Sequence, residues 1–296
     1  MNGIVRSGRG AALLAAAAGC ALVLATAGCN GSSGASGAAA ADAPVAAADG
    51  PVAAADPPAA GSRPERSTFT LMQMNLCLSG MAGCYVKVAY PAVLDEAVAR
   101  IRDARPDAVT LNETCRRDVV QIARRTGYHP RFTRVLYLDR PLPCVGPGGR
   151  GLFGDAILTR TARKRSVARD FQGQAGPERR RWLCVTTRAR VEVCTAHLNT
   201  RSPIEAAGNE AQCRELALRL ALRAAARPVI FGGDVNRRSS CAPVGFWTRT
   251  DRSAGQNPGL QHVYGSRALR ADAPQIVPAA HSDHDVLLVR ARRVAR

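Results

Sequence analysis

Asp234 and Asn236 stand immediately after the short apolar run 229–231 and a Gly-Gly pair. Such a run is typical of a buried strand whose carboxyl end opens onto a site. Because the two residues are two positions apart on an extended backbone, their side chains point to the same side. An Asp and an Asn directed into one cleft can hold a phosphate, a metal-bound water or both. Taken alone, the segment fits a polar turn after a core strand equally well.

Comparable polar residues mark four further strand ends. They are Asn75 near the end of residues 68–76, Glu113 after residues 106–111, His197 and Asn199 at the end of residues 191–198, and Asp283 and His284 before residues 286–289. A hard divalent cation such as Mg²⁺, or Mn²⁺ in its place, takes oxygen ligands that Glu113 and Asp283 can supply. Phosphodiester cleavage also needs a positioned water and neutralised phosphoryl charge, for which histidines and an Asp/Asn pair are suited. A single histidine at a strand end is more often structural, but five polar strand ends together predict metal-dependent phosphodiester chemistry.

The rest of the sequence predicts the elements that would position these residues. Apolar residues at helical spacing predict helices, and alternating or continuous apolar runs predict strands. The Pro- and Gly-rich residues 139–151 predict a surface loop. In chain order we expect strand 68–76, helix 91–104, strand 106–111, helix 115–126, strands 131–138, 153–159, 167–171, 182–187 and 191–198, helix 204–226, and strands 229–231, 259–264 and 286–289. These elements fit one large α/β domain over residues 67–296.

The first 66 residues have a different character. Residues 1–28 show a basic start, an apolar stretch and then small residues, the order of a secretory signal peptide. The residues before Cys29 are similar to a bacterial lipoprotein signal with Cys29 as lipid acceptor, although Thr26 stands where Leu is usual; ordinary cleavage and an uncleaved anchor are the alternatives. Residues 29–66, rich in Ala, Gly, Ser and Pro, predict a disordered linker. We therefore expect a protein that is secreted or tethered to the outer face of the bacterial cell membrane.

The cysteines fit export. Of the ten, Cys20 and Cys29 lie in the signal region, and the even number beyond it predicts up to four disulfides. A hairpin centred near Ala189 would bring Cys184 opposite Cys194 on adjacent predicted strands. Cys77 and Cys84 can close a short loop beside Asn75. The pairs Cys115–Cys144 and Cys213–Cys241 follow by elimination.

The chain is strongly basic. It has 41 Lys and Arg against 23 Asp and Glu, a formal net charge of +18. A surface of this kind attracts polyanions such as nucleic acid, anionic lipid or acidic cell-wall polymers. The charge supports a polyanionic partner without choosing among these, because an Arg- and Ala-rich composition also fits a GC-rich genome.

The strand-end motifs resemble those of the endonuclease/exonuclease/phosphatase superfamily. This superfamily includes deoxyribonuclease I-like nucleases, exonuclease III-like repair enzymes, neutral sphingomyelinases and inositol polyphosphate phosphatases. The resemblance extends from Thr68 to Val289 and implies a four-layer α/β/β/α sandwich of two packed mixed sheets flanked by helices. The motifs that carry it are Asn75, Leu111-Asn112-Glu113, Gly154-Asp155-Ala156-Ile157-Leu158, Thr195-Ala196-His197-Leu198, Gly233-Asp234-Val235-Asn236 and Ser282-Asp283-His284.

The resemblance also implies a role for each oxygen-bearing side chain. Glu113, with Asn75 nearby, would bind Mg²⁺, and Asp283 would complete the metal shell. Asp234 and Asn236 would orient the attacking water and the phosphate. A metal-dependent hydrolase is therefore the activity that the family resemblance implies.

The histidines bring one departure from the family pattern. His197 would hydrogen-bond the phosphate or assist the leaving group, and His284 would act as a base or stabilise phosphoryl charge. Family members commonly pair the final histidine with an Asp, but Gln261 takes that place here. A neutral amide can orient an imidazole but does not favour imidazolium as a carboxylate does. For the carboxylate that would orient His197, Asp155 is our candidate.

Four functions remain open from the sequence. The first is an exported nuclease acting on DNA or RNA, which the basic charge favours. The second is a sphingomyelinase or phospholipase, which would need an exposed apolar or aromatic loop. The third is an inositol-phosphate phosphatase on the same fold. The fourth is a catalytically weak polyanion-binding protein, motivated by Gln261. For each of them we expect a monomer.

Overall fold

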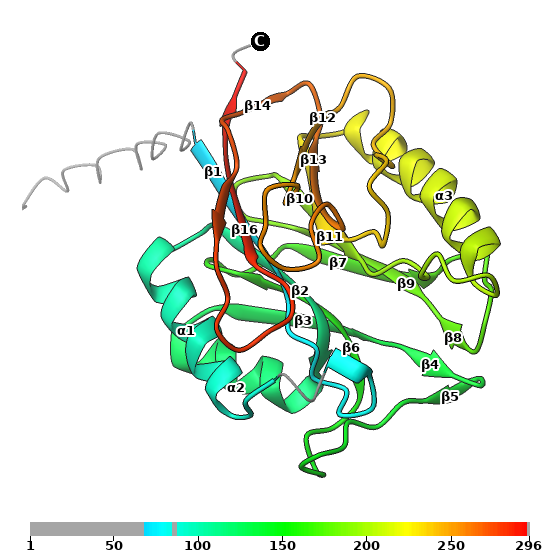
Figure 1. The fold of residues 1–296 in the computed structure, drawn as a ribbon. Helices are drawn as coiled ribbons and strands as arrows, with labels where there is room; N and C mark the ends of the chain where they lie inside the picture. The colour runs from blue at the N-terminus through cyan, green and yellow to red at the C-terminus, as the bar shows by residue number, and fades with distance from the viewer. Residues whose placement is uncertain (1–67, 85–87, 295–296) are drawn as a thin grey trace, which may run out of the picture. The chain divides into compact units, whose positions relative to one another are not determined.

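Two mixed β-sheets pack face to face in the computed structural model of the chain, which describes residues 68–84 and 88–294 (Figure 1). The predicted signal peptide, residues 1–28, and linker, residues 29–66, lie outside the described residues, as does Cys29. Within the described part of the chain, no helix is long and apolar enough to cross a membrane.

The first sheet has seven strands. Its order is β14 (Leu269–Ala271), β16 (Val286–Arg293), β1 (Thr68–Asn75), β2 (Ala108–Cys115), β6 (Phe153–Thr159) and β3 (His129–Arg134), with β15 (Gln275–Val277) paired to β16. Strands β1 and β2 are parallel, and helix α1 (Ala92–Ala104) connects them. Their carboxyl ends therefore lie side by side. Because β16 is antiparallel to β1, the start of β16 reaches the same end of the sheet.

The second sheet repeats this arrangement. Its order is β12 (Trp247–Thr250), β13 (Gln261–Gly265), β11 (Val229–Asp234), β10 (Glu192–Ala196), β9 (Arg181–Thr186) and β7 (Arg165–Asp170). Strands β10 and β11 are parallel and are connected through α3 (Ala206–Ala224), so their carboxyl ends are also neighbours. Strand β13 is antiparallel to β11 and places Gln261 opposite Asp234.

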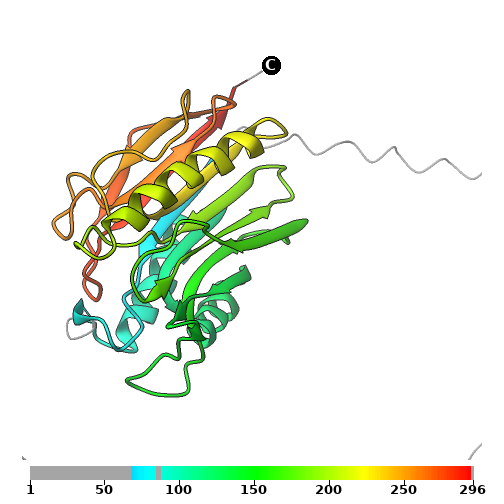
Figure 2. The ribbon, with the colours of Figure 1, turned by 90° about the vertical axis from the view of Figure 1, so that its right-hand side faces the viewer.

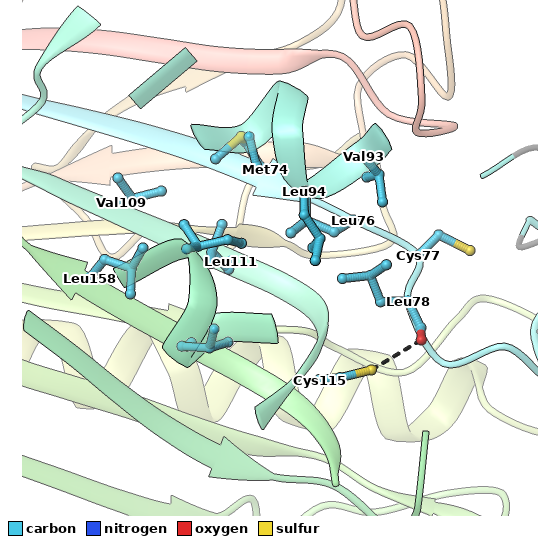
Figure 3. Close-up of a cluster of buried hydrophobic side chains, with 14 of the residues drawn as sticks. Met74, Leu76, Cys77, Leu78, Val93, Leu94, Val109, Leu111, Cys115 and Leu158 are labelled. Carbon is cyan, nitrogen blue, oxygen red and sulfur yellow. Dashed lines mark hydrogen bonds between the residues drawn. The ribbon is translucent and has the colours of Figure 1, made fainter. Parts of the chain in front are cut away.

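Helices cover the outer faces of both sheets. Helices α1 and α2 (Arg116–Thr126) pack on the first sheet, and α3 packs on the second, on the opposite side of the sandwich (Figure 2). Leu94 and Leu111 are buried between α1 and the first sheet (Figure 3). On α3, Leu216 and Leu220 are one helical turn apart and pack against the second sheet. The predicted four-layer sandwich is confirmed by this architecture and by the fold comparisons given below.

A third, small sheet departs from the predicted elements. Residues 131–138 were expected as one strand, but they divide after Arg134: β3 pairs with β6, whereas β4 (Leu136–Tyr137) pairs with β8 (Glu178–Arg179) and β5 (Arg140–Pro141). These strands, like β12, β14 and β15, have two to four residues. So few residues cannot show the period-two alternation by which a strand is recognised.

The structure forms all four of the expected disulfides. Cys184 and Cys194 are directly opposite each other on β9 and β10, with Cα atoms 4.1 Å apart. The others are Cys77–Cys84, Cys115–Cys144 and Cys213–Cys241. Cys213–Cys241 ties α3 to the loop after β11, and Cys115–Cys144 ties the end of β2 to the loop 139–151.

Candidate active site at the strand ends

Two carboxylates, one from each sheet, meet at a single amide. Asn75 Nδ2 at the end of β1 donates to Glu113 Oε1 on β2 (2.9 Å) and to Asp234 Oδ2 on β11 (3.0 Å). Asn75 Oδ1 accepts from the backbone N–H of Cys77 (3.1 Å), which fixes the orientation of the amide. The two sheets are thus joined at the place where the parallel pairs present their carboxyl ends.

Backbone strain accompanies two of these residues. Glu113 and Asn236 have φ near +52°, a conformation that non-glycine residues rarely adopt and that costs about 1–3 kcal/mol each. Glu113 lies in a β-bulge, because the pairing of β2 with β6 shifts between Leu111 and Thr114. A bulge re-aims the side chains that it contains. Strain retained at two strand ends indicates that the directions of these side chains serve the site.

Both predicted histidines face the Asp234 carboxylate. His284 Nε2 lies 3.5 Å from Asp234 Oδ2, and His197 Nε2 lies 3.9 Å from the same oxygen and 3.9 Å from Glu113 Oε1. Asp234 Oδ1 accepts the backbone N–H of Asn236 (2.9 Å). The Oδ2 atom of Asp234 is therefore the oxygen that faces the two imidazoles.

Arg180 is the partner of His197, in place of the carboxylate that we expected. Its Nη1 lies 2.9 Å from His197 Nδ1, its Nη2 lies 2.6 Å from Glu178, and its side chain is buried. A guanidinium can only donate, so His197 Nδ1 must accept and the ring proton resides on Nε2. Burial and the neighbouring Arg180 charge hold the pKa of His197 well below its usual range. His197 is therefore a neutral imidazole.

The other ring nitrogen of His197 also faces a donor. Asn236 Nδ2 lies 2.9 Å from His197 Nε2 and donates to the Leu198 carbonyl oxygen (2.9 Å). Since Arg180 occupies the one lone pair of a neutral ring, Nε2–H and the Asn236 amide are two donors side by side. The second N–H of the Asn236 amide and the His197 Nε2–H are thus adjacent donors, and such a pair can bind an oxyanion.

Asp155, our candidate for orienting His197, contacts Asn112 instead. Asn112 Nδ2 donates to Asp155 Oδ1 (2.9 Å), and Asn112 Oδ1 accepts the Asp234 backbone N–H (2.8 Å) and Gln73 Nε2 (2.8 Å). Asn112 thus holds β11 against the first sheet directly behind the site. Burial raises the pKa of Asp155 to about 7.

Gln261 and the neighbouring Asp251 form a buried pair. Gln261 Nε2 donates to Asp251 Oδ2 (3.2 Å) and to the Asp285 carbonyl oxygen (2.7 Å). The expected contact of Gln261 with His284 is not among the hydrogen bonds of the described residues, and His284 Nδ1 is buried without a partner there. Burial raises the pKa of Asp251 to about 6. Asp251, the residue after β12, is therefore the carboxylate that Gln261 contacts.

Asn199 lies outside the cluster. Its backbone N–H donates to Gln212 Oε1 on α3 (2.8 Å), and its carbonyl oxygen accepts from Asn209 Nδ2 (2.6 Å). Asn199 therefore secures the loop between β10 and α3 and has no contact with the two carboxylates among its hydrogen bonds.

The remaining carboxylates fit a hard cation. Among the hydrogen-bond contacts of the described residues, Glu113 Oε2 faces the disulfide sulfur of Cys84 at 3.9 Å, which has no hydrogen to donate, and burial raises the pKa of this carboxyl to about 7. Asp283 Oδ2 accepts from Asn257 Nδ2 (3.0 Å), whereas Asp283 Oδ1 is buried without a partner among the described residues. Buried carboxylate oxygens without a donor are the ligands that Mg²⁺ prefers. In the described part of the chain, two groups have three metal-ligating atoms within 4.8 Å of one another: Cys77, Cys84 and Glu113, and Cys184, Glu192 and Cys194. The cysteines of both groups form disulfides, so their sulfurs are not thiolates.

The structure adds three residues to this region that the sequence did not identify, namely Arg180, Asp251 and Asn257. Arg180 stands in the run Arg179-Arg180-Arg181, whose composition hides a buried member. Asp251 precedes no apolar run. A local pattern identifies residues at strand ends, but it does not identify a partner that arrives from another strand.

Comparisons with known proteins give the family and the fold of the chain. The model of the Endonuclease/Exonuclease/phosphatase family matches residues 85–284. No curated protein matches the sequence. Similar solved structures include an endonuclease/exonuclease/phosphatase from Beutenbergia cavernae (19% identity, 77% of this chain, 72% of that chain, TM-score 0.58). Others are the human Nocturnin catalytic domain with bound sulfate (16%, 77% and 94%, TM-score 0.59) and truncated Caenorhabditis elegans TDP2 (16%, 76% and 97%, TM-score 0.54).

Proposed function

This chain belongs to the endonuclease/exonuclease/phosphatase family and is a hydrolase of phosphoric ester bonds, and we propose that it cleaves phosphodiesters of nucleic acid with a divalent cation. The observation that carries the proposal is the meeting of Glu113, Asp234, His197 and His284 around the amide of Asn75. Each of these side chains comes from a different strand end, so the cluster is a product of the fold.

Glu113 and Asp283 would hold the cation, as their unpartnered oxygens suggest. Family members typically depend on divalent metals, and Mg²⁺ or Mn²⁺ is the ion we propose here. When bound, such an ion neutralises developing charge on the phosphoryl group and on the leaving oxygen. Its charge would also keep Glu113 ionised despite the burial of this carboxyl.

Asp234 would orient and deprotonate the attacking water. Its Oδ1 is held by Asn236, which leaves Oδ2 directed toward the shared centre of the site. His197 Nε2–H and the Asn236 amide, the two adjacent donors, would bind a non-bridging phosphoryl oxygen. His284, 3.5 Å from the same Asp234 oxygen, would bind a second one or hold the water. Preorganised donors of this kind each contribute about 10²–10³ in rate.

A polyanionic substrate rests on charge, and nucleic acid is the polyanion that we propose. The formal net charge of +18 favours a polyanion, and nucleic acid binding through phosphates is strong, steeply salt-dependent and largely indifferent to sequence.

One observation keeps a lipid substrate as the second candidate. At the turn between β4 and β5, Tyr137 is 41% exposed and Leu138 is 68% exposed. Strand β4 pairs with β8, which leads directly into Arg180 of the site. An exposed aromatic and an exposed aliphatic residue at a hairpin tip are suited to contact a lipid surface.

The test is hydrolysis by the purified full chain of plasmid DNA, RNA, sphingomyelin and inositol phosphates, each with Mg²⁺ and with EDTA. We expect cleavage of nucleic acid that EDTA abolishes and that Asp234→Ala lowers by about 10²-fold or more. Asp272→Ala is the matched control, because Asp272 is a half-buried carboxylate on β14's side of the first sheet whose ion-pair partner among the described residues is the exposed Arg292. Sphingomyelin cleavage without nuclease activity at any salt concentration would contradict the nucleic acid substrate and favour a lipid. Equal rates for Asp234→Ala and Asp272→Ala would refute the proposed active site.

We also propose that the chain is exported, either secreted or attached through Cys29. The order of residues 1–28 supports this proposal, and so do the four disulfides, which persist in oxidising compartments. Cell fractionation with mass spectrometry of the mature N-terminus distinguishes the two routes. An intact Met1 on protein in the cytoplasm would contradict both.

A further inference from the structure

The edges of the two sheets border an arginine-lined groove. Strand β3 is the last strand of the first sheet and β7 is the last strand of the second. Between them lies a cavity of about 650 Å³, lined by residues 130–134 of β3, residues 166–169 of β7 and the start of α2. Arg131 and Arg134 on β3, Arg169 on β7 and Arg181 on β9 line its walls.

A second cavity, of about 530 Å³, continues the first along α2. The two share Arg116, Val120 and Leu152, and the second adds Arg117 and Arg124. Together the two cavities, which we call the β3–β7 groove, have seven arginines and no carboxylate in their lining.

Most of these arginines have no ion-pair partner within residues 68–84 and 88–294. Of the seven, Arg181 alone forms an ion pair with a described residue, at 2.7 Å from Asp170. Arg116 and Arg117 occupy the first turn of α2, where the helix dipole is already positive and a cation is unfavourable. An exposed positive surface that the fold does not neutralise is suited to bind an external anion.

Protection of the sheet edges does not account for this arrangement. Charged side chains on edge strands do prevent two sheets from pairing. However, Arg116, Arg117 and Arg124 belong to a helix, which has no edge to protect. The arginines of the groove come from α2, β3, β7 and β9. What they have in common is that they line the groove, not that they lie on an edge strand.

One end of the groove leads to the strand-end cluster. In the first sheet, Arg134 is opposite Gly154, which is opposite Thr114, the neighbour of Glu113. In the second sheet, Arg181 follows Arg180, the partner of His197. The five residues 130–134 of β3 extend over about 13 Å along the groove.

We propose that the β3–β7 groove is a non-catalytic binding site for the phosphate backbone of a nucleic acid strand. Its guanidinium groups contact phosphates, whereas the apolar walls formed by Pro130, Phe132 and Val167 leave room for sugars and bases. A recessed groove accommodates a single strand better than a membrane surface, which requires a protruding contact. That the bound strand is also the substrate rests on the proposed function, but binding does not.

The test measures binding apart from cleavage. Full-length Asp234→Ala protein in EDTA is titrated with a fluorescent single-stranded oligonucleotide of twelve nucleotides, and anisotropy is followed from low to physiological salt. The groove variant adds Arg116→Gln, Arg131→Gln and Arg134→Gln. The control variant adds Arg270→Gln, Arg290→Gln and Arg292→Gln, three exposed arginines of β14 and β16 near the opposite edge of the first sheet. Thermal unfolding establishes that both variants fold.

We expect the groove variant to bind at least ten-fold more weakly at low salt than the control variant. Three lost phosphate contacts should also lower the slope of log Kd against log salt by about 2. Equal affinities and slopes in the two variants would overturn the proposal. So would an unchanged DNA affinity together with lost binding to phosphatidylglycerol vesicles, since the groove would then bind lipid. Groove-dependent binding in a protein that cleaves no nucleic acid would support the groove and refute the proposed substrate.

Discussion

Replacement of Arg180 tests the most unusual contact of the site. The change Arg180→Met keeps a similar apolar stem but removes the donor that faces His197 Nδ1 at 2.9 Å. With the guanidinium present, Nδ1 accepts and the proton stays on Nε2, where it can be donated to a phosphoryl oxygen. Without it, the ring can adopt the other tautomer, in which Nε2 is an acceptor and repels that oxygen.

The expected loss follows from the donor that remains beside the ring. Without Arg180, the Asn236 amide, 2.9 Å from His197 Nε2, favours the tautomer protonated on Nδ1 by about 0.5–1.5 kcal/mol, the worth of a neutral hydrogen bond. Nε2 then stays protonated in about a tenth to a third of the molecules, so we expect Arg180→Met to lower kcat/KM by about 3- to 10-fold. Removal of the donor itself in His197→Ala should cost about 10²–10³-fold and sets the upper limit. Because Arg180 also pairs with Glu178 at 2.6 Å, Glu178→Gln is the control for loss of that ion pair alone.

A double-mutant cycle separates a positioning role from direct substrate contact. If Arg180 acts through His197, the double variant should be no slower than His197→Ala. Additive losses would mean that Arg180 contacts the phosphate itself. The ¹⁵N shifts of the His197 imidazole give an independent measurement, with Nε2 protonated in the parent chain across pH 5–8. A protonated Nδ1 in the parent chain, or an unchanged tautomer in Arg180→Met, would refute the reasoning.

Three further predictions concern stability and the metal. Burial raises the pKa of Glu113 from 4.5 to about 7, so the folded metal-free chain binds a proton more tightly at this carboxyl than the unfolded chain does. Protonation of Glu113 therefore contributes up to about 3 kcal/mol to the free energy of unfolding. This contribution is fully present below pH 4.5 and is lost as the pH rises through 7. Thermal unfolding in EDTA should therefore have a lower midpoint at pH 8 than at pH 5, and Mg²⁺ should raise the midpoint mainly at pH 8. A Glu113→Gln variant whose midpoint depends on pH as steeply as that of the parent chain would contradict this prediction. Removal of the Cys77–Cys84 disulfide by a double Ala variant should weaken Mg²⁺ binding several-fold in calorimetry, because the Cys84 sulfur is 3.9 Å from Glu113 Oε2, and unchanged affinity would show that the loop does not support the site. Leu220→Ala in α3, where the side chain is 1% exposed, should lower the free energy of unfolding in urea by about 2–5 kcal/mol with little change in kcat, and a loss below 1 kcal/mol would mean that α3 packs loosely.

The main elements and the strand-end residues were predictable because they follow from local patterns. The spacing of Leu216 and Leu220 identifies α3, and the apolar run 229–231 identifies the start of β11. Glu113 and Asp234 lie in different sheets, and they could be placed in one site from motif order and the family resemblance. The four disulfides were also within reach, since Cys184 and Cys194 require only that two strands form a hairpin.

The partners of those residues depended on contacts between distant parts of the chain. The sequence led us to expect a carboxylate beside His197, but the fold brings Arg180, and with it a neutral ring and a fixed tautomer. Gln261 was expected beside His284, yet its amide bonds Asp251 from the next strand. Alternation and spacing specify which face of an element a residue occupies. Which group from another element lies opposite depends on strand register and sheet packing, which are decided by the sum of many long-range contacts.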